Sequence, residues 1–191
     1  YIFNVESLGW LWSTDYLILP TPSKRKMTSK KKNLLVTGGA GFIGSNFINF
    51  IHKKYPDYNI QLLDALTYAG NLENIVNGLK SNGHFRFFHG NVTHPDIVNQ
   101  LVSDSDIVIH FAAESHVTRS IYDNSLFFET DVIGTQVLAN AIVNHPVERF
   151  IHISSSEVYG TALSTPMTEN HPLNPMSPYA AAKAGADRLV Y

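Results

Sequence analysis

Five short apolar runs recur from Asn33 onward, and each has the length of one buried strand. They cover residues 33–37, 60–64, 85–89, 106–110 and 149–153. Helices are predicted between them, near residues 42–55, 71–80, 94–103, 124–144 and 178–191, and apolar residues recur at helical spacing on the first and the fourth. Apolar strands that alternate with helices form a parallel sheet covered on both faces. Because such crossovers are right-handed, the pattern predicts an α/β fold with a doubly wound parallel sheet.

The residues before the first predicted strand follow a different pattern. Residues 1–26 hold both tryptophans, and Pro20 and two acidic residues break their apolar clusters. No apolar stretch there reaches the roughly 18 residues of a membrane span, and no basic start precedes one as in a secretory signal. We therefore expect a non-native or disordered leader over residues 1–31 and one domain over residues 32–191. The chain ends inside a predicted helix, which favours a fragment of a longer protein.

Charge and composition narrow the classes of function. From residue 33 onward, 8 basic side chains stand against 14 acidic ones, a net charge of −6. This acidic body disfavours nucleic-acid binding, and we expect neither a nucleic-acid nor a membrane partner. The absence of cysteine excludes disulfides and thiol nucleophiles and is typical of the cytoplasm. No metal site is expected, because His84, His89 and His94 share neither a helix face nor a strand face.

A glycine-rich turn, TGGAGFIG, joins the first predicted strand to the first helix. Gly38 permits a sharp turn, Gly41 lets a pyrophosphate approach the backbone, and Gly44 lets the helix pack closely on the strand. The amides that open the helix can hold a diphosphate without lysines. Asp64 lies 20 residues past Gly44, where a carboxylate accepts a hydrogen bond from a ribose 2′-hydroxyl and repels a 2′-phosphate. The predicted cofactor is NAD rather than NADP; in the alternative, Asp64 is an ordinary strand-end turn residue.

Two further motifs carry acid–base chemistry. Tyr179 and Lys183 are four residues apart at a predicted helix start, so both side chains lie on one helix face. The ammonium stabilises the phenolate, which can take a proton from a sugar hydroxyl while NAD takes the hydride. The segment SSSEVYG leaves the fifth predicted strand at its ligand-facing carboxyl end, with Ser155 near the same sugar oxygen and Glu157 as a candidate base. In the alternative, these motifs are a solvated pair and a serine-rich turn.

Together these motifs resemble the extended short-chain dehydrogenase/reductase superfamily, with its Rossmann-type fold. The segments DALTYAGNL and AAESHV are most similar to the dTDP-glucose 4,6-dehydratase family, and the resemblance runs from about Lys32 to Tyr191. It implies a bound NAD and conversion of a nucleotide sugar to its 4-keto-6-deoxy form, by C4 oxidation, loss of water across C5 and C6, and hydride return. It also implies a homodimer of the full-length enzyme and a substrate lobe largely missing from this chain.

The resemblance also implies roles for single residues. Tyr179, with Lys183 and Ser155, would help NAD to oxidise the C4 hydroxyl, and Glu157 would remove the C5 proton. The implied catalytic residues are Ser155, Ser156, Glu157, Tyr179 and Lys183, and those contacting substrate are Ser115 and Ser155. The implied NAD site consists of Gly38, Gly41, Phe42, Ile43, Gly44, Asp64, Ala65, Leu66, Thr67, Asn91, Val92, Phe111, Ala112, Ala113, Ser115, Thr130, Tyr179 and Lys183.

Three positions depart from the dTDP-glucose enzymes. Ser156 stands where those enzymes carry the aspartate that expels water from C6, and a serine hydroxyl is too weakly acidic to replace it directly. Asn91 and Thr118 also replace usual aspartates, and the amide of Asn91 can still accept a hydrogen bond from adenine. GDP-mannose 4,6-dehydratases carry Thr-Ser-Glu and still dehydrate. A nucleotide-sugar decarboxylase, a 4-epimerase and a non-catalytic dinucleotide-binding module therefore stay open as alternatives.

Overall fold

The computed structural model describes residues 2–4, 31–81 and 83–191 and has one sheet at its centre. Within these residues the strand order is β1-β6-β5-β2-β3-β4. The strands are β1 (Ile2–Asn4), β2 (Asn33–Thr37), β3 (Asn59–Asp64), β4 (Phe85–His89), β5 (Ile107–His110) and β6 (Arg149–His152). Strands β2 to β6 run parallel, and β1 pairs antiparallel with β6. The predicted doubly wound parallel sheet is confirmed.

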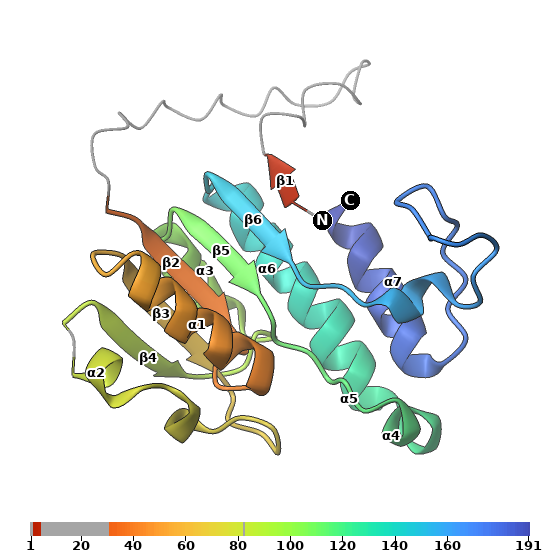
Figure 1. Ribbon diagram of the computed structural model, residues 1–191, viewed down its shortest axis with the longest axis horizontal. Coiled ribbons are helices and arrows are strands. Elements are labelled where there is room, and N and C mark those ends of the chain that lie inside the picture. The colour runs from red at the N-terminus through yellow and green to blue at the C-terminus, as the bar shows by residue number, and fades with distance from the viewer. Residues whose placement is uncertain (1, 5–30, 82) are drawn as a thin grey trace.

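Helices cover both faces of the sheet. They are α1 (Phe42–Lys54), α2 (Asn77–Lys80), α3 (Pro95–Ser103), α4 (Val117–Tyr122), α5 (Ser125–Phe127), α6 (Gly134–Asn144) and α7 (Pro178–Val190), with the short turns η2 (Leu72–Asn74) and η4 (Ser156–Tyr159) and the π-helical segment η3 (Phe128–Ile133). Figure 1 shows α1 in front of the sheet and α3 and α6 behind it. Leu35 and Val36 of β2 belong to the two opposite cores, because side chains alternate across a strand.

The edge strand β1 was not predicted. The sequence pattern left residues 1–26 outside the fold, whereas the structure pairs Ile2 with Ile151 and Asn4 with Arg149 of β6. Residues 1 and 5–30 of the predicted leader lie outside the described residues. The short antiparallel β1 extends the parallel sheet beyond β6 by one strand.

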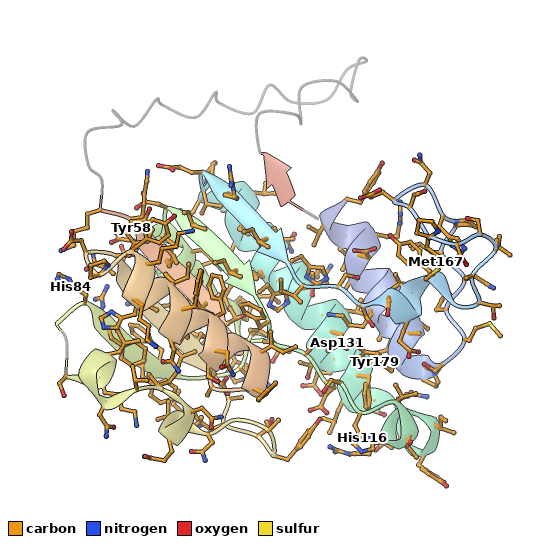
Figure 2. All side chains as sticks on the ribbon, in the orientation of Figure 1. Tyr58, His84, His116, Asp131, Met167 and Tyr179 are labelled. Carbon is orange, nitrogen blue, oxygen red and sulfur yellow. The ribbon has the colours of Figure 1, made fainter. Side chains whose placement is uncertain are left out.

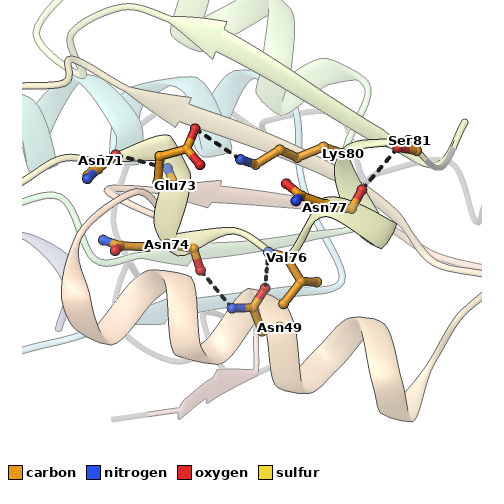
Figure 3. A network of polar contacts seen from close by, with 8 residues as sticks. All are labelled: Asn49, Asn71, Glu73, Asn74, Val76, Asn77, Lys80 and Ser81. Carbon is orange, nitrogen blue, oxygen red and sulfur yellow. Dashed lines mark hydrogen bonds and ion pairs between the residues drawn. The ribbon is translucent and has the colours of Figure 1, made fainter.

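The helix predicted over residues 71–80 is wrong in its middle, where the structure separates η2 from α2. Ile75 is buried there, and the backbone N–H of Val76 donates to the side chain of Asn49 at 3.2 Å. Asn49, which projects from α1, also donates to the carbonyl of Asn74 at 2.9 Å, as the network in Figure 3 shows. The side chain of Asn49 thus binds backbone groups that a continuous helix would have used itself.

The helix predicted over residues 124–144 forms, but η3 widens it in the middle. By length and composition, Ser125–Asn144 is apolar enough to cross a membrane. The structure buries one side of it against α3 and α7 and leaves the rest at the surface, so we interpret it as a helix that packs within this domain. The short helix α4 was not predicted, because its N-cap is His116, which is not among the usual capping residues.

Replacing Gly38 by Ala is expected to destabilise the fold by about 3 kcal/mol. Gly38 has a φ of +68°, and an added Cβ would lie 2.4 Å from the backbone nitrogen of Ala112. Gly78 of α2 is the matched control, because a Cβ there meets nothing within 4 Å. Gly78→Ala should therefore leave stability unchanged or raise it slightly. Urea unfolding of both variants checks this, and equal effects would contradict it.

Candidate active site

The glycine-rich turn presents unpaired backbone amides at the start of α1. Gly41 is the N-cap of α1, and the first helical hydrogen bond runs from Ser45 N–H to its carbonyl at 3.0 Å. The amides of residues 42–44 have no acceptor among the described residues. A Cβ on Gly44 would lie 2.5 Å from the carbonyl oxygen of Gly38, which matches the predicted close packing, whereas a Cβ on Gly41 would lie 3.4 Å from that oxygen, an ordinary contact distance. Three unpaired donors at a helix start favour an anion.

Asp64, at the end of β3, holds this turn in place. Its Oδ2 accepts from the backbone N–H of Ala40 at 2.9 Å, and its Oδ1 accepts from that of Leu66 at 2.8 Å. The carbonyl of Ala40 in turn accepts from the backbone of Asn71 and the side chain of Asn74. Each carboxylate oxygen accepts two hydrogen bonds, so Asp64 retains capacity for a ribose hydroxyl. Asp64 can therefore hold the glycine-rich turn in place and still accept a hydrogen bond from a ribose hydroxyl.

The predicted Tyr–Lys pair lies at the start of α7, beside the carboxyl ends of β5 and β6. Lys183 is 3% exposed, and its Nζ donates to the carbonyl of Ile153 at 2.8 Å, directly before the predicted serine segment. The backbone N–H of Tyr179 donates to Ser120 of α4 at 3.1 Å, and its ring contacts Phe127 edge-on. The hydroxyl of Tyr179 has no hydrogen-bond partner among residues 31–81 and 83–191. The arrangement leaves that hydroxyl available to a ligand.

Buried polar groups surround Lys183. Burial lowers the pKa of its ammonium, while the charges of Asp131 and Asp187 act in the opposite direction. Asp131 belongs to η3, is 1% exposed, and accepts the backbone N–H of Glu114 at 2.7 Å through Oδ1. Burial raises the pKa of Asp131 to about 7, although Lys183 opposes that shift. Asp131 and Glu114 each keep one buried oxygen without a hydrogen bond in the described part of the chain. Figure 2 shows Asp131 and Tyr179 beyond the ends of β5 and β6.

Two buried histidines lie beneath this cluster. The hydroxyl of Thr135 donates to the carbonyl of Asp131, so His110 must donate to Thr135 through Nε2 and accept from Thr37 through Nδ1. Burial and neighbouring charges lower the pKa of His110 well below its usual range. Burial, followed by the charge of Lys183, lowers the pKa of His152 to about 3. Both rings are therefore neutral at physiological pH.

The serine segment follows β6 and forms η4. The hydroxyl of Ser155 caps η4 by accepting the backbone N–H of Glu157 at 3.2 Å. The side chains of Ser156 and Glu157 are exposed. Because Lys183 binds the carbonyl of Ile153, the structure brings this segment and α7 together, as predicted. The catalytic roles of Ser155, Ser156 and Glu157 stay predictions.

The remaining predicted NAD residues lie in segments that follow the strands. Phe42 and Ile43 are 82% and 64% exposed at the start of α1, as a ligand surface requires. Val92, in contrast, is 4% exposed and packs in the core. The others are partly or fully exposed. They follow β3, β4 or β5, or lie in η3, and are Ala65, Leu66, Thr67, Asn91, Phe111, Ala112, Ala113, Ser115 and Thr130. Their contacts to NAD stay predictions.

The sequence did not predict Asp131 as part of the site. Its one signal was an acidic residue inside a long apolar helical pattern. The π-helical geometry of η3 is found frequently at functional sites, and it places this carboxylate toward Lys183 rather than toward solvent. Among the described residues, no group of three His, Asp or Glu side chains could hold a metal ion.

This fold and site define a class of protein. The chain has a doubly wound sheet, a glycine-rich turn after β2 and a Tyr–Lys pair at the start of α7. These are the features of a Rossmann-type member of the extended short-chain dehydrogenase/reductase superfamily. The GDP-mannose 4,6 dehydratase family matches residues 35–191. The chain belongs to this family, and the predicted resemblance is confirmed.

Individual relatives support the same assignment. A dTDP-glucose 4,6-dehydratase of Mycobacterium tuberculosis is 47% identical over 160 residues, which are 82% of this chain and 47% of that protein. The crystal structure of DesIV, a dTDP-glucose 4,6-dehydratase from Streptomyces venezuelae with NAD and TYD bound, aligns with a TM-score of 0.77 and 46% identity, over 82% of this chain and 50% of that one. A UDP-N-acetylglucosamine 4-epimerase of Methanobrevibacter ruminantium has the same TM-score at 30% identity, over 85% of this chain and 50% of that one. The chain spans about half the length of the curated relatives it matches.

Proposed function

We propose that this chain is the cofactor-binding part of an NAD-dependent nucleotide-sugar 4,6-dehydratase of the dTDP-glucose type. The observation that carries the proposal is the pairing of two sites at one edge of the sheet. The unpaired amides of α1 lie at the end of β2, and the buried Lys183 with the available hydroxyl of Tyr179 lies at the ends of β5 and β6. The first site suits a diphosphate and the second suits proton transfer.

The residues present fit NAD. A dinucleotide needs donors for its diphosphate, an acceptor for a ribose hydroxyl, and a donor near its nicotinamide ribose. The amides of residues 42–44 supply the first, and Asp64 supplies the second. Lys183 uses one of its three N–H donors on Ile153, so the others remain for a ligand. When bound, NAD would accept a hydride from the sugar and return it later.

The chain's own groups would move the protons. Tyr179 would take the proton of the C4 hydroxyl, because the neighbouring Lys183 stabilises its phenolate. The exposed Glu157 would remove the C5 proton that the new ketone acidifies. Ser156, which is also exposed, stands where a stronger acid would assist loss of water from C6, so a water molecule or Glu157 would have to deliver that proton. We further propose a cytoplasmic homodimer for the full-length protein.

Calorimetry of the chain with NAD and NADP tests cofactor choice. We expect NAD to bind at least about tenfold more tightly, because the carboxylate of Asp64 repels a 2′-phosphate. Tyr179→Phe should bind NAD as the parent does. No NAD binding, or a preference for NADP, would refute the proposal.

Product analysis separates the dehydratase from its enzymatic alternatives. Incubation of the full-length protein with dTDP-glucose or UDP-glucose should give the 4-keto-6-deoxy product. A C4 epimer without that product would favour the epimerase, and release of carbon dioxide from UDP-glucuronate would favour the decarboxylase. The higher identity to dehydratases than to epimerases supports the first outcome.

A further inference from the structure

Three side chains from two segments, Tyr68 after β3 and Glu114 and Arg119 after β5, form a row near the start of α4. The guanidinium of Arg119 lies over the ring of Tyr68, with its central carbon 4.5 Å from the ring centre. Its Nη1 lies 3.8 Å from Oε2 of Glu114, whose side chain is 9% exposed. That oxygen is buried and has no hydrogen bond within the described residues. Arg119 is therefore held between an aromatic face and a buried carboxylate.

The order of the strands places this row across the centre of the sheet edge. Tyr68 lies in the segment that follows β3, and Arg119 lies in the segment that follows β5. Strand β2 pairs with β3 on one side and with β5 on the other. A contact between the two segments must therefore cross the carboxyl end of β2. The glycine-rich turn and the unpaired amides of α1 begin at that end.

Both sides of the crossing are anchored beneath it. On one side, Leu66 and Asn71 bind Asp64 and Ala40 through their backbone amides, so Tyr68 is carried at the tip of a fixed loop. On the other side, α4 binds the start of α7, through Ser120 and the backbone N–H of Tyr179. The contact itself is exposed, since Tyr68 is 58% exposed and the side chain of Arg119 is 46% exposed. It can open by side-chain rotation while the segments that carry it stay in place.

We propose that Tyr68 and Arg119 form a strap that closes over the bound dinucleotide and retains NAD through the reaction. The proposal rests on the function proposed above, in which one NAD accepts and then returns the same hydride. Loss of the reduced cofactor between those steps would leave an oxidised sugar that the enzyme could not complete. A contact that spans the diphosphate position slows that loss, because it has to break before the dinucleotide can leave.

The dissociation rate of NAD from the intact chain tests the strap. Tyr68→Leu removes the aromatic face and should speed NAD dissociation about fivefold, whereas Tyr68→Phe keeps the face and should restore the parent rate. Arg119→Gln should speed NAD dissociation about tenfold, because it removes the contact with the ring of Tyr68 and the ion pair with Glu114 together. The double variant should dissociate no faster than Arg119→Gln alone, since both changes break one contact. A chase of bound NAD with excess unlabelled NAD measures each rate.

Arg188→Gln is the matched control. Arg188 makes a comparable contact with the ring of Tyr191, at 4.6 Å, but at the far end of α7. Its loss should leave NAD dissociation unchanged. Equal dissociation from the parent, Tyr68→Leu and Arg119→Gln would overturn the strap while leaving NAD binding intact. Faster NAD association in the variants without faster dissociation would overturn it too, because the contact would then be an obstacle to entry. Failure of the parent chain to bind NAD would instead overturn the proposed function.

Discussion

Tyr179→Phe should lower turnover of the proposed dehydratase about a thousandfold. The change removes the hydroxyl that would take the proton of the C4 hydroxyl. It should leave the fold intact, because that hydroxyl has no partner in the described part of the chain. The ring keeps its edge-on contact with Phe127, at 6.3 Å between centres, and the backbone N–H still donates to Ser120. Turnover of dTDP-glucose and urea unfolding, both measured on this variant of the full-length protein, check both expectations.

NAD affinity separates a chemical effect from a binding effect. Tyr179→Phe should bind NAD within about threefold of the parent, since the diphosphate contacts lie at α1. Tyr122→Phe is the control, because Tyr122 is 88% exposed at the end of α4 and has no part in the site. It should change neither turnover nor stability. Full turnover by Tyr179→Phe would contradict the acid–base assignment and favour a non-catalytic dinucleotide-binding module.

The strands and the two local motifs could be predicted from the sequence because their signals are local. Every predicted strand of the parallel sheet lies within one residue of the observed one at each end. The glycine spacing and the Tyr–Lys spacing carry their geometry within a few residues, so the structure places both where they were expected. A buried strand and a close backbone approach restrict residue type strongly at each position.

The features that the sequence did not predict depend on partners far along the chain. The break between η2 and α2 comes from Asn49, which lies 27 residues before the amide that it binds. Asp131 joins the site because η3 turns it toward α7, and its spacing from Lys183 carries no pattern. The contact between Tyr68 and Arg119 likewise follows from strand order and not from either segment alone. Local periodicity contains no information about such pairings.

Asp131 should make the free energy of unfolding depend on pH. Burial raises its pKa to about 7 in the folded chain, from 3.8 when exposed. Because the folded state then holds the proton more tightly, the stability present below about pH 4 is lost as the pH rises to about 7. The loss corresponds to about 4 kcal/mol for a shift of this size.

The two buried histidines act in the opposite direction. His152, with its pKa lowered to about 3, and His110, also lowered, are neutral in the folded chain. The unfolded chain binds their protons below about pH 6.5, so their stability contribution is lost as the pH falls. Two histidines outweigh one carboxylate in the acid range. The stability contributed by these three groups should therefore rise with pH to about pH 7 and change little above it.

Asp131→Asn isolates the contribution of the carboxylate. The amide keeps the shape and can still accept the backbone N–H of Glu114, but it does not titrate. Relative to the parent, the variant should be equally stable near pH 4 and more stable by about 4 kcal/mol near pH 8. Glu129→Gln is the matched control, because it removes a carboxylate from the same η3 segment where the side chain is exposed. Urea unfolding at several pH values measures both variants, and a pH-dependent gain of the same size in Glu129→Gln would contradict the assignment to Asp131.

The same substitution should also change the pH dependence of turnover in the full-length protein. The charge of Asp131 raises the pKa of Lys183, against the burial that lowers it. Without that charge, Lys183 loses its proton at lower pH, and its support of the Tyr179 phenolate is lost with it. We expect Asp131→Asn to lose activity at a lower pH than the parent does, while NAD binding and the fold persist. A variant that gained stability and kept the parent's pH profile would show that Asp131 affects only folding.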